Sequence, residues 1–183
     1  MTHIGTQYIE TERLILRRFE LSDAPAMFAN WASDDEVTKY LTWPTHADVS
    51  VTEGILGQWV PQYEKDDYYN WAIVLKENGS QPIGNINVAH LREDGAVPEI
   101  GYCMGRRWWH QGIMSEALGA IIDFLFHQVG IRRILALHDV NNPHSGDVMR
   151  KCGMKFEGIR EKAGQNNQGV VDMACYAIEA KDR

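Results

Sequence analysis

The residues with the clearest chemical potential lie in one segment, Arg106 to Leu118, which reads RRWWHQGIMSEAL. It follows an expected strand that ends at Met104 and leads into an expected helix from Gly112. A helix start leaves backbone N–H groups unpaired and carries a positive dipole, so it can bind a phosphate, and Gly112 has no side chain to keep that phosphate away. The spacing matches neither GxGxxG nor the Walker motif, which argues against nucleotide loops of those kinds.

The cysteines and histidines indicate no competing chemistry. Cys103, Cys152 and Cys175 are far apart and form no CxxC pair, so we expect free, packed thiols instead of a zinc or redox site. Four histidines lack metal-ligand spacing to nearby carboxylates: His90, His110, His138 and His144. We therefore expect no metal ion.

The first half of the chain supplies a strand and two helices around this segment. Alternating side chains predict a strand over 14–19. A helix is expected over 23–31 with Ser22 as its N-cap, and a second over 50–63 that Pro61 ends or bends. The apolar face of the second helix would carry Val51, Ile55, Trp59 and Val60.

The second half changes period twice. Alternation predicts three antiparallel strands, at 71–75, 83–89 and 97–104. The helix from Gly112 would run to Val129 and stop at Gly130. The remaining elements are a strand at 133–138, a short helix at 145–152, and closing strands at 156–161 and 170–178. Such an order indicates an α/β domain with a mixed sheet, not a doubly wound parallel one.

Composition limits the classes of protein that the chain can represent. Its 183 residues, 44% of them hydrophobic, suit one folded domain over residues 1–183. No apolar run reaches the ~18 residues of a membrane span, and the segment before Ile9 lacks signal-peptide features, so we expect a cytoplasmic protein. The net charge of −7 argues against general nucleic-acid binding.

The charge is unevenly distributed along the chain. Residues 1–100 carry 16 acidic and 7 basic side chains, whereas residues 101–183 carry 9 acidic and 11 basic ones. One interpretation is chance decoration of the surface. The other is that the first half meets a cationic substrate and the second half an anionic cofactor.

Four segments resemble, in order and spacing, the GNAT N-acetyltransferases and within them the ribosomal-protein N-terminal acetyltransferases. They are IETERLILRRF, EIGYCM, WHQGIMSEAL and NPHSGDVMRKCGMKFEG. The resemblance implies a mixed α/β (α+β) GNAT-like fold, in which a mostly antiparallel central sheet is splayed at the coenzyme A site and flanked by helices. It also implies direct acetyl transfer from acetyl-CoA to a primary amine, without an acyl-enzyme.

The resemblance places acetyl-CoA on two neighbouring features. Its pyrophosphate would lie on the backbone of His110, Gln111, Gly112, Ile113, Met114 and Ser115. Its pantetheine would follow the strand edge at Cys103 and Met104, because an unpaired edge offers alternating donors and acceptors. Asn142 would bond the cofactor or an ordered water. The chain departs from the superfamily's loop pattern at Trp109 and at Met114.

Two residues are predicted to act in the chemistry. Glu99, at the start of the central strand, is the expected base, acting directly or through a water, and an apolar cleft would raise its pKa; its alternative is an exposed strand-end carboxylate. By resemblance, Ser145 would lie near the sulfur and protonate the thiolate, and its alternative role is a helix N-cap. Val148 and Met149 occupy the stretch where many superfamily members carry a tyrosine.

The acceptor amine is open at this stage. The branch implies a protein N-terminal α-amino group, and the alternatives are a small amine such as a polyamine or aminoglycoside, or a CoA-binding module without catalysis. Four tryptophans are candidates for the core or for the acceptor wall: Trp31, Trp43, Trp59 and Trp71. We expect a monomer or homodimer that binds neither nucleic acid nor membrane.

Overall fold

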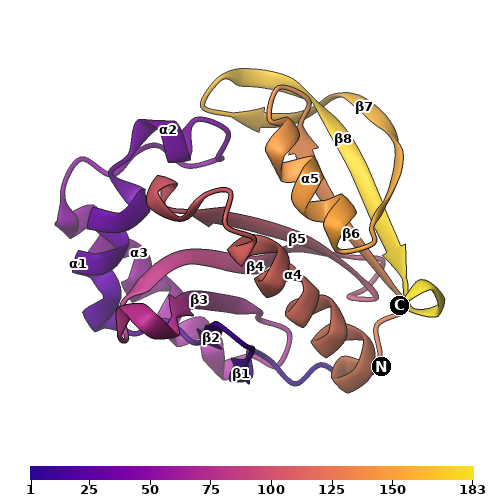
Figure 1. Cartoon of the computed structure of the whole chain (residues 1–183), viewed down its shortest axis with the longest axis horizontal. Coiled ribbons are helices and arrows are strands. Elements are labelled where there is room, and N and C mark those ends of the chain that lie inside the picture. Colours follow the sequence, from indigo (N-terminus) through magenta and orange to yellow (C-terminus); the bar gives the residue numbers. More distant parts are fainter.

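The computed structural model describes residues 1–183 as an eight-stranded sheet with helices on both faces (Figure 1). The strands are β1 (Ile9–Glu10), β2 (Leu14–Arg17), β3 (Asn70–Leu75), β4 (Pro82–Arg92), β5 (Val97–Met104), β6 (Arg133–Asp139), β7 (Lys155–Asn166) and β8 (Gly169–Glu179). The α-helices are α1 (Ala24–Met27), α2 (Asp35–Thr38), α3 (Val49–Trp59), α4 (Ile113–Phe124) and α5 (Pro143–Lys151). None of them combines the length and apolar content needed to cross a membrane.

The sheet order is β1-β2-β3-β4-β5-β6-β8-β7, and every neighbouring pair is antiparallel except β5 with β6. The predicted mixed sheet and the predicted three-strand meander are therefore confirmed. The closing strands β7 and β8 are longer than predicted and form a hairpin with two register shifts in β7. Bulges of this kind bend a strand and discourage pairing at an exposed sheet edge.

The long helix of the second half agrees with its prediction. α4 begins directly after Gly112 and continues through a π-helical turn over Leu125–Val129 to Gly130, whose φ of 83° ends it. A left-handed residue at this position is the usual role of a glycine that stops a helix.

The start of the first helix differs from the expectation. Ser22 is not an N-cap, because a 3-10 turn over Leu21–Asp23 precedes α1 and its cap is Glu20. The carboxylate of Asp23 accepts the backbone N–H of Glu20 at 2.8 Å. The backbone N–H of Asp23 donates in turn to the carbonyl oxygen of Glu20 at 3.0 Å. These two bonds satisfy the start of the turn and leave Ser22 without a capping role.

The buried face of α3 also differs from the expectation. Val51 is 42% exposed, whereas Thr52 and Leu56 are fully buried. Thr52 can lie inside because its hydroxyl is 2.7 Å from the ring nitrogen Nδ1 of His46. The predicted effect of Pro61 is confirmed, since α3 ends at Trp59 and tightens into a 3-10 turn over Val60–Glu64.

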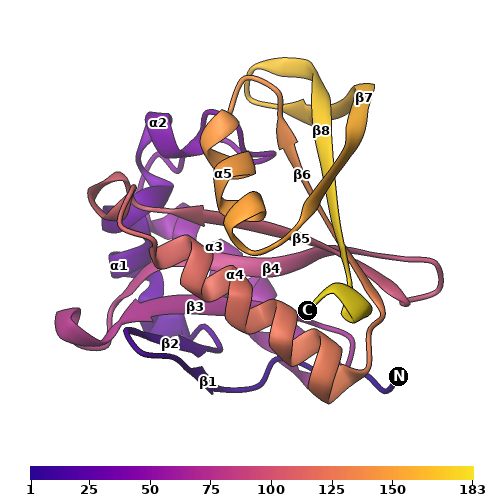
Figure 2. The same ribbon diagram turned by 45° about the vertical axis from the view of Figure 1, so that its right-hand side comes forward.

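Two hydrophobic clusters cover the two faces of the sheet. The larger packs α4 against strand residues that include Trp71 and Ile100, and the smaller packs α1 and α3 against the other face, where Ala72 lies. Neighbouring strand residues such as Trp71 and Ala72 fall in different clusters because side chains alternate across a strand. Figure 2 shows α4 and α5 lying side by side over one face, with α1 and α3 behind the sheet. β5 thus runs between two packed layers.

Candidate active site

The site begins where β5 and β6 part. These parallel strands are paired only at Glu99 with Leu135 and at Ile100 with Ala136. Beyond Ile100 the edge of β5 that faces β6 has no ladder partner, while its other edge remains paired with β4 as far as Met104. An unpaired edge exposes N–H and C=O groups that an extended ligand can bond. The predicted splay at Cys103 and Met104 is therefore present.

The α4 helix starts beside this open edge. Gly112 is its N-cap with φ of 75°, and no side chain caps the first turn. His110 also has a positive φ of 59°, so the loop turns sharply just before the helix. The first backbone N–H groups of the helix have no intrahelical acceptors and are available to an anion.

The side chains of the loop divide into an inner and an outer set. His110, Gln111 and Gly112 are exposed, whereas Ile113 and Met114 are buried in the larger cluster. Met114, which replaces a small residue of the superfamily pattern, therefore points into the core. Its size does not crowd the outer face of the helix start.

The turn between β1 and β2 anchors this loop through Thr11 and Arg13, which were not among the predicted site residues. Arg13 forms an ion pair with Glu116 at 2.6 Å and donates from Nη1 to the carbonyl oxygen of Gln111 at 2.9 Å. Thr11 donates to the other carboxylate oxygen of Glu116 at 2.6 Å. Burial raises the pKa of Glu116, but hydrogen bonds from Thr11 and Arg13 outweigh it and hold the pKa below its ordinary value.

The available signal for this anchor was indirect. Thr11 and Arg13 lie in the segment IETERLILRRF, and Glu116 lies in WHQGIMSEAL, so two of the four resembling segments meet here. The sequence contained the charges, but not their contact across 103 positions of the chain. Only the fold brings them together.

The start of α5 lies across the splay from β5. α5 begins at Pro143, its N-cap is Asn142, and the Asn142 side chain makes no capping bond. Ser145 lies in the first turn, so its alternative role as an N-cap is wrong. Its backbone N–H donates to the carbonyl oxygen of Asn142 at 3.2 Å. The Pro143 ring suits the first helical position, which explains the earlier start.

The side chain of Ser145 is held by a residue of β5. Its hydroxyl donates to the phenolic oxygen of Tyr102 at 3.0 Å, and the Tyr102 hydroxyl donates to the carbonyl oxygen of Ser145 at 2.9 Å. Tyr102 was not among the predicted site residues. It lies within EIGYCM, on the part of β5 that has left β6.

Glu99 lies at the closed end of the splay. Its Oε2 accepts from Nε of Arg92 at 2.7 Å, and its side chain is only 14% exposed. The surroundings differ from the apolar cleft that the sequence analysis considered, because the nearest partner is a guanidinium. Glu99 is also not an exposed strand-end carboxylate. Its catalytic role stays a prediction.

The face of β5 opposite α4 carries polar and aromatic groups. Cys103 packs with the smaller cluster, and on the neighbouring strands Asn85 donates to Asn70, which in turn donates to Tyr68 at 3.0 Å. Among the tryptophans, Trp31 and Trp71 are fully buried core residues, and Trp71 packs on Phe124 of the α4 side. The half-buried tryptophans on this face are Trp43 and Trp59.

The β7–β8 turn closes over one end of the splay. Asn167 donates from its backbone to Leu41 at 3.1 Å and from its side chain to the carbonyl oxygens of Thr38 and Trp43, at 2.9 and 2.8 Å. Tyr40 donates to the carbonyl oxygen of Asn141, at 3.0 Å. Figure 1 shows α2 reaching towards this hairpin and the start of α5. Segments far apart in the sequence thus border the same opening.

Burial makes the cysteines poor nucleophiles. All three are free, and burial raises the pKa of Cys103 to about 12 and that of Cys152 to about 11. A buried thiol with a raised pKa is rarely ionised at neutral pH, and the thiolate is the reactive form. The chain contains no group of three or more His, Cys, Asp or Glu side chains that could hold a metal ion.

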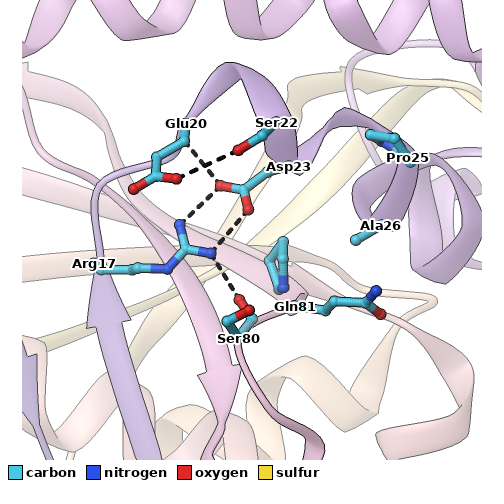
Figure 3. Close-up of a pocket in the computed structure, with 9 residues that line it drawn as sticks. Arg17, Glu20, Ser22, Asp23, Pro25, Ala26, Ser80 and Gln81 are labelled. Atoms are coloured by element: carbon cyan, nitrogen blue, oxygen red, sulfur yellow. Dashed lines mark hydrogen bonds and ion pairs between the residues drawn. The ribbon is translucent and has the colours of Figure 1, made fainter.

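A hollow of about 440 Å³ lies on another part of the surface, near the β3–β4 connection (Figure 3). At its centre, Arg17 makes two bonds of 2.8 Å to the carboxylate of Asp23 and a third to the carbonyl oxygen of Ser80. These polar groups satisfy one another. The Arg17 network therefore stabilises the fold at this hollow, whereas the unpaired backbone groups lie at the splay.

Comparison with known proteins agrees with this geometry. Residues 13–155 match the family model of the acetyltransferase (GNAT) domain. The chain is 37% identical over 156 residues to the [ribosomal protein uS5]-alanine N-acetyltransferase of Escherichia coli (strain K12), covering 82% of this chain and 79% of that protein. A GNAT-family acetyltransferase from Bacillus anthracis superposes with a TM-score of 0.82 at 26% identity, covering 96% and 99% of the two chains.

RimL, a ribosomal L7/L12 α-N-protein acetyltransferase solved with coenzyme A, shares the fold with a TM-score of 0.83 at 21% identity, covering 94% and 98% of the two chains. The chain therefore belongs to the GNAT family. It is an acetyl-CoA-dependent N-acetyltransferase, and the predicted fold, enzyme class and cosubstrate are confirmed. Its acceptor and the roles of individual residues are matters for proposal.

Proposed function

We propose that this N-acetyltransferase modifies the α-amino group of a protein N-terminus, as a ribosomal-protein type of enzyme does. The observation that carries the proposal is the 37% identity to an enzyme named for a ribosomal-protein alanine, over 82% of this chain. The free thiols also suit a reducing compartment, so a cytoplasmic location is part of the proposal.

The chemistry of the site supports an α-amine over a lysine. An α-amino group has an ordinary pKa near ~8 and a lysine one near ~10.4, so the α-amine needs less help to lose its proton. Glu99 already accepts a hydrogen bond from the guanidinium of Arg92, so its carboxylate is not held free for a strongly protonated amine. An amine that is partly neutral at pH 7 fits such a site.

Acetyl-CoA would lie along the open edge of β5 and the start of α4. The pantetheine amides would bond the backbone at Cys103 and Met104, with Asn142 on the opposite side of the splay. The pyrophosphate would meet the backbone N–H groups of the loop and the first helical turn, which the fold leaves without acceptors. Residues proposed there are His110, Gln111, Gly112, Ile113, Met114 and Ser115.

Acetyl-CoA supplies the acetyl group as a thioester, and the residues of the chain supply position and proton transfer. The amine nitrogen bonds to the carbonyl carbon, and the bond from that carbon to sulfur breaks. Glu99 accepts the proton that the amine loses, directly or through water, while Ser145 donates a proton to the departing sulfur and regains one from solvent water. Holding amine and thioester together lowers the activation free energy by several kcal/mol, because a bimolecular step becomes effectively unimolecular.

The test measures acetyl transfer to matched acceptors with isotopically labelled acetyl-CoA. The acceptors are a peptide with a free N-terminal alanine or serine, the same peptide with its N-terminus blocked and one internal lysine, spermidine, and an aminoglycoside. Mass spectrometry locates the label. We expect kcat/KM for the free α-amine to exceed that for every other acceptor at least tenfold, about 1.4 kcal/mol. Preferred transfer to spermidine or the aminoglycoside contradicts the proposal.

A second experiment identifies the natural acceptor. The enzyme and labelled acetyl-CoA are incubated with a cell extract, and labelled N-terminal peptides are sequenced by mass spectrometry. Labelled ribosomal-protein N-termini support the proposal, whereas label confined to small molecules or to lysine side chains overturns it.

A further inference from the structure

Tyr102 occupies a distinctive place on β5. It lies two residues beyond the last pairing of β5 with β6, at Ile100 and Ala136, and so on the stretch that borders the open splay. Its ring packs against the larger hydrophobic cluster, which fixes the ring from one side. Its hydroxyl reaches across the splay to the first turn of α5.

The hydroxyl of Tyr102 contacts one residue of α5 at two atoms. It accepts from Oγ of Ser145 at 3.0 Å and donates to the backbone oxygen of the same residue at 2.9 Å. A free serine side chain samples three staggered rotamers, so one bond to Oγ selects among them. The second bond holds the helix turn that carries the serine.

No other contact of this turn fixes the serine hydroxyl. Asn142 makes no side-chain capping bond, and Ser145 is tied to Asn142 only through its backbone N–H. The hydroxyl of Ser145 has Tyr102 as its hydrogen-bond partner. The orientation of Ser145 therefore depends on a residue from a different strand.

We propose that Tyr102 is the positioning residue for Ser145, holding its hydroxyl in one rotamer at the mouth of the β5–β6 splay. This inference rests on the proposed role of Ser145 as proton donor to the departing sulfur. The Ser145 hydroxyl proton, which points at Tyr102 in this structure, turns to the departing sulfur as the carbon–sulfur bond breaks, and a solvent water reprotonates Oγ. The Tyr102 hydroxyl keeps its own proton on the backbone oxygen of Ser145 throughout.

Tyr102 suits a positioning role because its hydroxyl proton is already donated to the backbone oxygen of Ser145. Burial raises the pKa of Tyr102 far above its ordinary value, although the bond from Ser145 opposes the rise. A phenol with such a pKa stays protonated at neutral pH. It can still donate and accept a hydrogen bond without a change of charge.

The kinetic test compares Tyr102→Phe, Ser145→Ala and the double variant with the wild type. Tyr102→Phe keeps the packed ring and removes only the hydroxyl. We expect each single variant to lower kcat about threefold to tenfold, less than the ~100-fold of a dominant general acid, because a thiolate leaving group needs little protonation. The double variant should be no slower than Ser145→Ala, because the two residues act as one unit. KM for acetyl-CoA should stay within about twofold in all three.

Tyr176→Phe is the matched control. The hydroxyl of Tyr176 accepts from Arg150 at 2.6 Å and makes no hydrogen bond to Ser145. Tyr176→Phe removes one phenolic hydroxyl beside the same hydrophobic cluster as Tyr102, and kcat should remain that of the wild type. Independent losses in kcat that multiply in the double variant, or a loss confined to KM, overturn the proposal.

A structural measurement separates this inference from the identity of the acceptor. Crystal structures of the wild type and Tyr102→Phe show the rotamer of Ser145 without any amine being acetylated. We expect one rotamer directed at Tyr102 in the wild type, and a different rotamer or several in Tyr102→Phe. The same single rotamer in both proteins overturns the positioning role, whatever amine the enzyme acetylates.

Discussion

The two edges of β5 differ in one respect that governs the whole site. Its edge towards β4 is paired from Arg92 with Val97 to Gly84 with Met104, whereas its edge towards β6 is paired at two positions only. The first edge is saturated and serves as scaffold. The second leaves backbone donors and acceptors free beside the uncapped start of α4. The proposed cofactor site thus lies where the pairing of β5 with β6 stops.

The Arg17–Asp23 hollow differs from the splay because its polar groups are already bonded to one another. It is a real concavity, but each of its central charges already has partners within the chain. The splay lacks such mutual satisfaction. Unsatisfied polar backbone, and not concavity alone, marks the place where a polar ligand adds bonds.

The largest expected effect concerns the start of α4. In Gly112→Asp a carboxylate would either repel the pyrophosphate or draw Arg13, whose Nη2 is 3.5 Å from the new Cβ, away from Gln111 and Glu116. We expect the Kd for acetyl-CoA, measured by calorimetry, to rise about fiftyfold, or about 2.3 kcal/mol. Gly79→Asp, at another positive φ and in open space, is the control and should bind normally. Unchanged affinity in Gly112→Asp removes the loop from the cofactor site.

The next effect concerns the Arg17–Asp23 hollow. Arg17→Ala leaves the nearly buried carboxylate of Asp23 without its cation, so we expect a loss of about 2 kcal/mol in the free energy of unfolding. Activity at a permissive temperature should be unchanged. Arg106→Ala, which breaks the more exposed pair with Asp34, is the control and should cost less than about 1 kcal/mol. A loss of turnover in folded Arg17→Ala would contradict the separation of the two regions.

A smaller effect is expected at the closed end of the splay. Glu99→Gln removes the proposed proton acceptor and keeps the shape of the side chain. Because an α-amine needs little help to lose its proton, kcat at neutral pH should fall about tenfold, below the ~100-fold typical of a general base, while the Kd for acetyl-CoA changes less than about twofold. Glu157→Gln, a carboxylate of β7 paired with Arg133, is the control. Wild-type turnover in Glu99→Gln would remove the catalytic assignment.

The smallest effect is the pH dependence of the loop anchor. The pKa of Glu116 lies below its ordinary value of 4.5 in the folded chain, so its stabilisation is complete above pH 4.5 and is lost as the pH falls through the folded value. Glu116→Gln should cost about 1 kcal/mol at pH 7 and progressively less in acid, as denaturant unfolding at several pH values measures. The exposed Glu77→Gln is the control. A difference that grows in acid would contradict the anchor.

Much of this structure could be predicted because it is local. The period-two stretches from Trp71 to Met104 and the helical period after Gly112 appear as β3, β4, β5 and α4 at nearly the predicted bounds. The predictions that failed depended on a neighbour. Ser22 is not the cap because Glu20 and Asp23 bond each other instead. Thr52 occupies the buried position expected of Val51 because its hydroxyl is hydrogen-bonded to the His46 ring.

By itself the sequence determined the element types, the glycine at the start of α4 and the chemical kinds of residue on β5 and α5, since these depend on hydrophobic period and on residue type over short spans. Only the tertiary structure decided that Arg13 secures the α4 loop and that Tyr102 is bonded to Ser145. Such contacts join residues that are adjacent in space through the packing of separate strands and helices. No local pattern records them.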